Sequence, residues 1–290
     1  MYTDMFGKKR MKTALHVHTN RSDGGLSPQE AIRYFKERGF DAVALTDHWV
    51  WHEGGEMDGV QILSGCEYNS PHGDTASGVF HILGIGAPCE PQVQDRADAQ
   101  CYVDAIRQAG GIAILAHPAW SLNTVEQVKG LEGICGTEIY NTVSGVHASN
   151  RPDSSAIVDL LANAGLCFPL IAVDDCHYYD NDAAVSYIMI DVSDGKTSQA
   201  DLTQKIAQGA FYATQGPEIH LSVEGSKAVV RCSPAVKISF YSQTAWSADR
   251  NAYGDGMTQA QYQLKPFEKW IRAEVTDAMG NRAWSNVISL

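Results

Sequence analysis

Short apolar segments alternate with helical segments along this 290-residue chain up to about residue 208. Continuous apolar strands of this kind are typical of parallel sheets that helices cover on both faces. The pattern repeats many times, and polar residues follow the carboxyl ends of the strands. It therefore predicts an α/β fold with a barrel whose active face is formed by those strand ends.

The expected elements follow from this periodicity. Strands are predicted at Thr13–Val17, Asp41–Thr46, Val60–Cys66, Val79–Ile85, Ile112–Ala116, Ile134–Ile139, Cys167–Val173 and Val185–Val192. Helices are predicted at Pro28–Arg38, Gln92–Ala109, Ser154–Ala164 and Gln199–Gln208. Ser27 is the expected N-cap of the first helix, and Glu30 completes a capping box.

The pattern changes at about Gly209, after which only strand-like segments occur, separated by turn signals such as Gly254-Asp255-Gly256. This part is predicted to form a small C-terminal antiparallel β-sandwich packed on the barrel. The expected division is an N-terminal leader at 1–11, a barrel at 12–215 and a β-sandwich domain at 216–290. The last domain is expected to support the barrel; a role in a homo-oligomer remains open.

Composition limits the partners. The chain has 34 acidic residues against 22 Lys and Arg, which argues against a nucleic-acid polymer or an anionic membrane surface as a partner. Seven scattered cysteines suit reduced thiols in a cytoplasmic protein. We find no signal peptide and no run of 18 apolar residues, so we expect a cytoplasmic protein that acts on a small molecule.

Histidines and carboxylates gather at the predicted strand ends. His16 and His18 are two residues apart on a strand, so both side chains point to the same face. Imidazole is a common metal ligand, and Asp23 adds an oxygen nearby. The full set is His16, His18, Asp23, His48, Glu67, His81, His117, Asp175 and His177. Nine nitrogen and oxygen ligands exceed the needs of one tetrahedral zinc ion, which predicts two or three divalent metals.

The ordered motifs that carry these residues resemble the polymerase-and-histidinol-phosphatase (PHP) superfamily of metal-dependent phosphoesterases. They are His16-Val17-His18-Thr19, Ser22-Asp23-Gly24, Thr46-Asp47-His48, Gly65-Cys66-Glu67, His81-Ile82-Leu83-Gly84, His117-Pro118 and Asp175-Cys176-His177. The resemblance implies a distorted (β/α)7 TIM-like barrel over about residues 12–215. The segment that follows Gly209 is called the tail below. Its motifs Phe211-Tyr212-Ala213-Thr214-Gln215-Gly216-Pro217-Glu218-Ile219 and Ala283-Trp284-Ser285-Asn286 resemble a branch of this superfamily that has a β extension and includes carbaryl hydrolase.

The resemblance also implies a trinuclear metal centre of Zn, Mn or Fe. It places His16, His18, Glu67 and Asp175 on one metal, lets Glu67 bridge to a second metal held by His81 and His117, and gives Asp23, His48 and His177 to a third. Two departures from the family pattern concern single positions. Asp174 stands where the family more often has Ser, and some relatives have His at the position of Asp23.

Residues around the expected centre receive supporting roles. Asp47, Glu138 and Asp174 are predicted to orient the ligands. Arg21, Asn141 and Arg151 are predicted to bind substrate, with the arginines clamping phosphate oxygens. Further loop candidates for substrate or proton contacts are His52, His72, His147, Trp49, Trp51 and Trp120. Cys66 and Cys176 should face away from the metals because each is one residue from a ligand.

Three functions remain open at this point. Three divalent ions, three ligand carboxylates and one hydroxide leave a formal charge of roughly +2, which suits a phosphomonoester dianion such as a nucleotide or sugar phosphate. The expected reaction is hydrolysis by a metal-bridging hydroxide, with Glu67, Asp175 and His177 in catalysis. The alternatives are a carbamate or carboxylic ester hydrolase on the same metals, and a non-catalytic metal-binding module.

Overall fold

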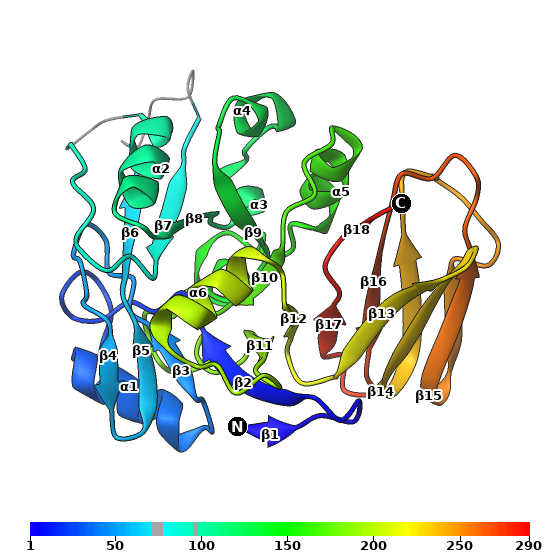
Figure 1. Cartoon of the computed structure of the whole chain (residues 1–290), viewed down its shortest axis with the longest axis horizontal. Helices are drawn as coiled ribbons and strands as arrows, with labels where there is room; N and C mark the ends of the chain where they lie inside the picture. Colours follow the sequence, from blue (N-terminus) through cyan, green and yellow to red (C-terminus); the bar gives the residue numbers. More distant parts are fainter. Residues whose placement is uncertain (71–77, 95–97) are drawn as a thin grey trace.

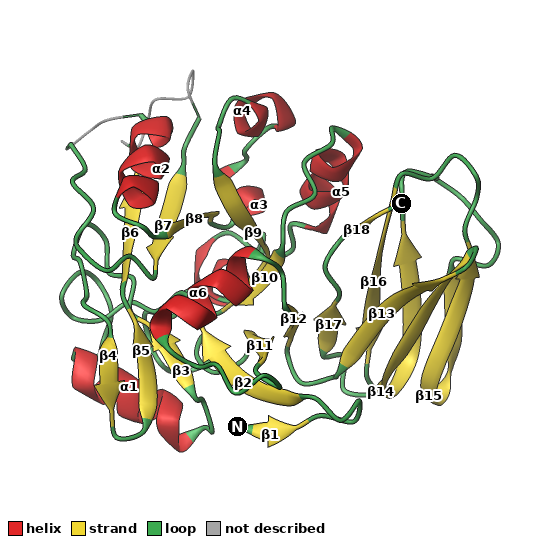
Figure 2. Cartoon of the chain, viewed as in Figure 1, coloured by secondary structure: helices red, strands yellow, loops and turns green. Residues whose placement is uncertain are grey.

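The computed structural model describes residues 1–70, 78–94 and 98–290, and it has a mixed α/β fold. The described residues form one sheet of thirteen strands and another of five strands. Figure 2 shows that the helices lie in the part of the chain that precedes the tail, whereas the tail is built of strands and loops. The change of pattern predicted near Gly209 is therefore confirmed.

The first part of the large sheet follows the predicted alternation only in part. β2 (Lys9–Ala14), β3 (Ala42–Ala44) and β5 (Val60–Leu63) are parallel neighbours. α1 (Pro28–Glu37) connects β2 to β3 and has the predicted capping box of Ser27 and Glu30. Between β3 and β5, however, the chain forms β4 (Gly55–Met57), which is antiparallel to β5, and the described residues there contain no helix.

The five-stranded sheet contains β6 (Gly65–Asn69), β7 (His81–Ile85), β8 (Ile112–Leu115), β9 (Ile134–Asn141) and β10 (Leu170–Val173). β8, β9 and β10 are parallel, but β7 is antiparallel to both β6 and β8. The prediction of an entirely parallel barrel is thus wrong at β7 and also at β11 (Tyr187–Asp191), which is antiparallel to β2. The apolar sequence of β7 does not reveal its direction, because all five of its residues are buried in either orientation.

Several predicted boundaries also differ. The predicted strand Val60–Cys66 is divided at Ser64 into β5 and β6. The helix expected from Gln92 is α2 (Ala99–Gln108), which begins where the Asp98 side chain accepts a hydrogen bond from the amide of Cys101. The other helices of this region are α3 (Pro118–Ser121), α4 (Val125–Lys129) and α5 (Ser155–Asn163), with a π-helix, η1 (Ser144–Ala148).

The two sheets approach each other at the carboxyl ends of their strands. A parallel bridge joins Val17 to Cys176, and the amide of His18 donates a 3.0 Å hydrogen bond to the carbonyl of Cys176. A second parallel bridge joins His48 to Glu67. Segments that carry the predicted ligands are therefore held side by side, although each follows a different strand.

The tail is antiparallel, as predicted, but it continues the large sheet. β11 (Tyr187–Asp191) pairs with β2 and with β12 (Phe211–Thr214). In sequence, α6 (Gln199–Ala207) lies between β11 and β12. β12 pairs in turn with β17 (Arg282–Trp284). The other tail strands are β13 (Ile219–Glu224), β14 (Lys227–Tyr241), β15 (Asn251–Gln263), β16 (Trp270–Thr276) and β18 (Ile288–Ser289).

The tail strands are joined to the rest of the large sheet, because hydrogen bonds run without a break from β14 through β16, β17 and β12 to β11 and β2. Likewise, residues of the expected leader take part in the sheet, since β1 (Tyr2–Thr3) pairs with β2. Figure 1 shows the tail strands at the end of the molecule opposite α1 and α2.

The tail has its own hydrophobic core, and an ion pair joins it to α5. Buried side chains such as Ile238, Phe240 and Tyr262 form this core. The ion pair is formed where β16 meets α5: the guanidinium of Arg272 donates two hydrogen bonds, of 2.6 and 3.0 Å, to the carboxylate of Asp159. Among the described residues, no helix has the length and apolar character needed to cross a membrane.

Candidate metal centre

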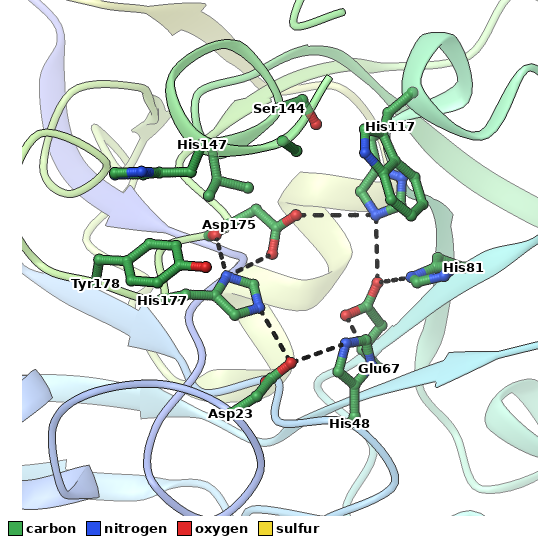
Figure 3. A pocket seen from close by; sticks show the side chains of 13 residues that line it. Asp23, His48, Glu67, His81, His117, Ser144, His147, Asp175, His177 and Tyr178 are labelled. Carbon is green, nitrogen blue, oxygen red and sulfur yellow. Dashed lines mark hydrogen bonds and ion pairs between the residues drawn. The ribbon is translucent and has the colours of Figure 1, made fainter. Parts of the chain in front are cut away.

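A pocket of about 290 Å³ lies at the strand ends where the two sheets meet. Its described lining consists of Asp23, His48, Glu67, His81, His117, Trp120, Val143, Ser144, His147, Ala148, Asp175, His177 and Tyr178 (Figure 3). His16 and His18 are fully buried and contact the carboxylates of Glu67 and Asp175. The structure thus brings together all nine side chains predicted as ligands.

Four of these side chains present their ligand atoms to one point. Nε2 of His16, Nε2 of His18, Oε2 of Glu67 and Oδ1 of Asp175 are separated by 3.0 to 3.2 Å in five of their six pairs. A tetrahedron with such edges has its centre about 1.9 Å from each corner, close to the metal–ligand bonds of about 2.0–2.2 Å found at zinc sites. All four residues are buried.

Glu67 links this group to a second one through its other oxygen. Oε1 of Glu67 lies 2.7 Å from Nδ1 of His81 and 3.4 Å from Nε2 of His117. Oε2, which faces the first group, also lies 3.2 Å from Nδ1 of His48. A carboxylate with different imidazoles at its two oxygens is suited to bridge two cations.

The third group is more open to solvent. Asp23 is about half exposed, with Oδ1 lying 3.2 Å from Nδ1 of His18 and Oδ2 lying 3.5 Å from Nε2 of His177. Nε2 of His48 is 3.8 Å from Oδ2 of Asp23. Figure 3 shows Asp23 between the rings of His48 and His177. This group has the donor atoms for a cation but a looser arrangement than the first.

The electrostatics of the cluster favour a cation. Burial opposes the charged form of His16, but the carboxylates of Asp175, Glu67 and Glu138 outweigh it and raise its pKa to about 10. Burial likewise opposes ionisation of Glu67, but the surrounding histidines hold the pKa of its carboxyl well below the usual value. Metal ions can replace the protons that these groups share.

Two orphaned atoms support the fit of metals to this donor set. Within the part of the chain that the structure describes, Nδ1 of His48 and Oδ1 of Asp175 are buried, and their close approaches to Glu67 and to His16 and His18 lack hydrogen-bond geometry. Buried polar atoms are rarely left without a partner, because the loss of hydration costs about 1–3 kcal/mol. A cation bound by these atoms would compensate that cost.

Glu138 lies where the sequence predicted an orienting carboxylate. Its Oε1 accepts a 2.7 Å hydrogen bond from Nδ1 of His16, which leaves Nε2 to face the cluster. Its Oε2 accepts hydrogen bonds from the amide of His117 and from Nδ2 of Asn141. Asn141 also donates to Asp175 and is buried, so it supports the ligands and is not part of the described pocket lining.

Among the described residues, the carboxylate of Asp47 contacts the loop that carries Asp23 and none of the imidazoles predicted as ligands. Its carboxylate accepts hydrogen bonds from the amides and hydroxyls of Thr19 and Ser22 and contacts Nε2 of His52. The loop that carries Asp23 is fixed in this way. His52 is therefore a partner of Asp47, and it is absent from the described pocket lining.

Asp174 has a similar structural position. It accepts hydrogen bonds from the amides of Ala184, Val185 and Ser186 and from the hydroxyl of Thr142. Burial raises its pKa to about 7, against the effect of these hydrogen bonds. The carboxylate shapes the segment before β11, which corrects the prediction that it orients a metal ligand.

The predicted arginine clamp is not at the pocket. Arg21 and Arg151 are exposed, and neither lines the pocket; its described lining contains no Arg or Lys. His72 lies outside the described residues. Trp120 does line the pocket, whereas Trp49 and Trp51 do not belong to its described lining.

Sequence reasoning missed Val143, Ser144, Ala148 and Tyr178 as pocket residues. Three of the lining residues, Ser144, His147 and Ala148, belong to η1. A π-helix is frequent at functional sites, but no motif in the sequence announces it. The adjacency of Tyr178 to His177 was the only available signal for that residue.

The backbone is strained at two ligands. His117 has φ of 27° and Asp175 has φ of 54°, a region that non-glycine residues rarely adopt. Asp175 follows β10, and its amide donates a hydrogen bond to the carbonyl of His16. Strain of this kind persists where the surrounding structure enforces it, often at functional sites.

Comparison with known proteins gives a family match over just more than half of the chain. The model of the PHP domain family matches residues 14–166, which include seven of the nine ligand-type residues; Asp175 and His177 follow this range. An uncharacterized protein of Methanocaldococcus jannaschii is 27% identical over 125 residues, which cover 37% of this chain and 68% of that protein.

One solved structure shows a similar fold over the whole chain. A two-domain protein from Bacteroides vulgatus, described as containing a predicted PHP-like metal-dependent phosphoesterase, aligns over 100% of this chain and 98% of its own, with a TM-score of 0.57 and 14% identity. A protein from Bifidobacterium adolescentis that is described as a metal-dependent phosphoesterase aligns over 59% of this chain and 89% of its own, with a TM-score of 0.42 and 15% identity.

Proposed function

This chain belongs to the PHP domain family, and we propose from that premise that it is a metal-dependent phosphoesterase acting on a small phosphomonoester. The observation that carries the proposal is the convergence of nine ligand-type side chains on one pocket, four of them with near-tetrahedral spacing. A degenerate, non-catalytic module would be expected to have lost some of these side chains.

The residues fit two or three divalent cations, with zinc, manganese and iron as candidates. His16, His18, Glu67 and Asp175 would hold one cation, and Glu67 would share a second with His81 and His117. Asp23, His48 and His177, with His18 nearby, have the donors for a third. Bound cations of this kind lower the pKa of a coordinated water and neutralise negative charge on a substrate.

Charge supports a dianionic substrate. The positive charge of three divalent cations would exceed the negative charge of Asp23, Glu67 and Asp175. The site would therefore stay positive after one hydroxide is counted. The protein's own contribution is to position groups around the pocket. Nδ1 of His177 contacts the carbonyl of Asp175 at 2.7 Å, so its Nε2 faces Asp23 and the open side of the site.

A second candidate function is hydrolysis of an uncharged carboxylic ester or carbamate. The observation that favours it is the described pocket lining, which has no Arg or Lys but includes Trp120, Val143 and Ala148. An apolar wall suits an uncharged acyl or aryl group better than a phosphate held by side chains. In the phosphoesterase, the metals alone would have to supply the positive charge.

A substrate screen separates the two functions. Purified protein loaded with Mn²⁺ or Zn²⁺ would be assayed with p-nitrophenyl phosphate, nucleoside monophosphates and sugar phosphates, and in parallel with naphthyl acetate and a naphthyl carbamate. Glu67→Gln protein, prepared in the same way, controls for contaminating hydrolases. The proposal expects phosphomonoesters to be the best substrates and inorganic phosphate to inhibit competitively. Faster hydrolysis of the naphthyl compounds, without inhibition by phosphate, would overturn it.

A further inference from the structure

A separate cluster of ligand-type side chains lies at the mouth of the pocket. His147 on η1 and Asp180 and Asp182 in the loop after His177 each offer a ligand atom, and these atoms lie within 4.8 Å of one another. We propose that His147, Asp180 and Asp182, the mouth cluster, bind a divalent cation in addition to those of the nine-residue centre. This inference does not depend on the reaction that the enzyme catalyses.

One pair of ligand atoms in the mouth cluster is as close as those of the central ligands. Nε2 of His147 lies 3.0 Å from Oδ1 of Asp180. The ligand atoms of His16, His18, Glu67 and Asp175 are separated by similar distances. Oxygen and nitrogen atoms at this separation can share one cation of bond length about 2.0–2.2 Å.

Asp182 gives the independent indication of a ligand. Its side chain is fully buried, and Oδ2 accepts hydrogen bonds of 2.7 and 2.8 Å from the amides of His177 and Tyr178. The remaining oxygen, Oδ1, is buried without a hydrogen-bond partner among the described residues. A buried carboxylate oxygen in this state is costly unless it is paired or coordinates a metal.

The donor set selects the class of cation. One imidazole nitrogen and two carboxylate oxygens form a mixed site that suits Mn²⁺ or Zn²⁺ and offers no thiolate for softer metals. Three protein ligands leave coordination positions for water, as at open metal sites. His147 and Asp180 are exposed, so exchange with solvent is expected to be fast and binding weaker than at the buried centre.

The position of the cluster gives the cation a role. His147 lines the pocket, and its ring packs on Tyr178 with centroids 4.4 Å apart (Figure 3). A cation there would join η1 to the loop that follows His177. It would also place positive charge at a pocket whose described lining has no Arg or Lys.

The test compares the number of bound metals in matched proteins. Wild type, His147→Ala and Asp180→Asn would be dialysed against rising MnCl₂, and bound Mn²⁺ would be counted per chain by electron paramagnetic resonance. His220→Ala, which removes an exposed histidine of the tail, is the matched control. The proposal expects wild type and His220→Ala to bind one more Mn²⁺ per chain than His147→Ala and Asp180→Asn, or to bind it at least tenfold more tightly.

A structural readout accompanies the count. Amide hydrogen exchange in 144–148 and 178–182 should slow when Mn²⁺ is raised over the range in which the additional ion binds, and this effect should be absent in His147→Ala. Equal Mn²⁺ stoichiometry and affinity in all four proteins would overturn the proposal. So would an exchange response that is the same in wild type and His147→Ala.

Discussion

The carboxylate of Glu138 accepts a 2.7 Å hydrogen bond from Nδ1 of His16, and this contact determines which ring nitrogen faces the cluster. We expect Glu138→Gln to weaken metal binding by about 10–100-fold, because an amide is a poorer acceptor and its NH₂ group cannot accept from the amide of His117. Competition with a chromogenic chelator measures the affinity. The exposed Glu132→Gln is the control, and unchanged affinity in Glu138→Gln would contradict the orienting role.

Removal of a central carboxylate charge should abolish activity without unfolding the protein. Glu67→Gln and Asp175→Asn each keep the shape of the side chain but lose the negative charge that faces the histidines. Asn also tolerates the φ of 54° found at position 175. We expect near-complete loss of turnover with normal circular dichroism, and retention of most activity by either variant would refute the proposed ligand set.

Much of this site could be predicted from the sequence, because each ligand lies in a short motif at a strand end. His16 and His18, for example, share a face through the two-residue period of an extended chain, and the structure places both rings beside Glu67. The direction of β7 could not be predicted, since a fully buried strand is equally apolar in either direction. The mixed α/β class is therefore confirmed, while the expected parallel connections are wrong at β7 and β11.

The loop and π-helix residues that line the pocket were less predictable than the residues predicted as metal ligands. Arg21 and Arg151 follow strand ends in sequence, but a loop has no period that fixes the direction of its side chains, and both lie outside the pocket lining. Ser144 and His147 line the pocket because the chain forms a π-helix at this point. No residue type in this segment indicates that the backbone forms the hydrogen bonds of a π-helix.

The ion pair between Asp153 and Arg282 should make the junction of barrel and tail sensitive to acid. Burial raises the pKa of Asp153, but hydrogen bonds from Ser155 and Arg282 outweigh it and lower this pKa below its usual value. A carboxyl with a lowered folded-state pKa stabilises the fold above its unfolded pKa of about 3.9, and this contribution is lost as the pH falls through the folded-state pKa.

We therefore expect Asp153→Asn to unfold at lower denaturant concentration than wild type at pH 7, with the difference shrinking as the pH falls below the unfolded-state pKa of about 3.9. Urea titrations of both proteins at a series of pH values measure this trend. Asp255→Asn, which changes an exposed carboxylate that forms no ion pair among the described residues, is the control for general charge effects. A difference that stays constant across the series would show that the ion pair is not its source.

Glu268 should matter for stability and not for turnover. Its carboxylate is buried in the tail and accepts hydrogen bonds from Ser242, Tyr262 and the amide of Lys265. Glu268→Gln should lower the free energy of unfolding by about 1–3 kcal/mol, since an amide cannot accept all of these bonds. Turnover should stay within a few-fold, as it should for His220→Ala and Asp255→Asn. A hundredfold loss of kcat in any of the three would show that the tail contributes to the chemistry.

The last prediction concerns substrate binding by Tyr178. Figure 3 shows its hydroxyl directed toward His177 and Asp175 at the open side of the pocket, whereas Arg151 is exposed outside the lining. One hydrogen bond from this hydroxyl to the substrate contributes about 0.5–1.5 kcal/mol, which corresponds to a factor of about 2–12 in binding. We expect Tyr178→Phe to raise KM for the best substrate within this range while kcat changes little. Arg151→Ala should leave both constants unchanged. A raised KM in Arg151→Ala with none in Tyr178→Phe would mean that the loop of Arg151 closes over the bound substrate.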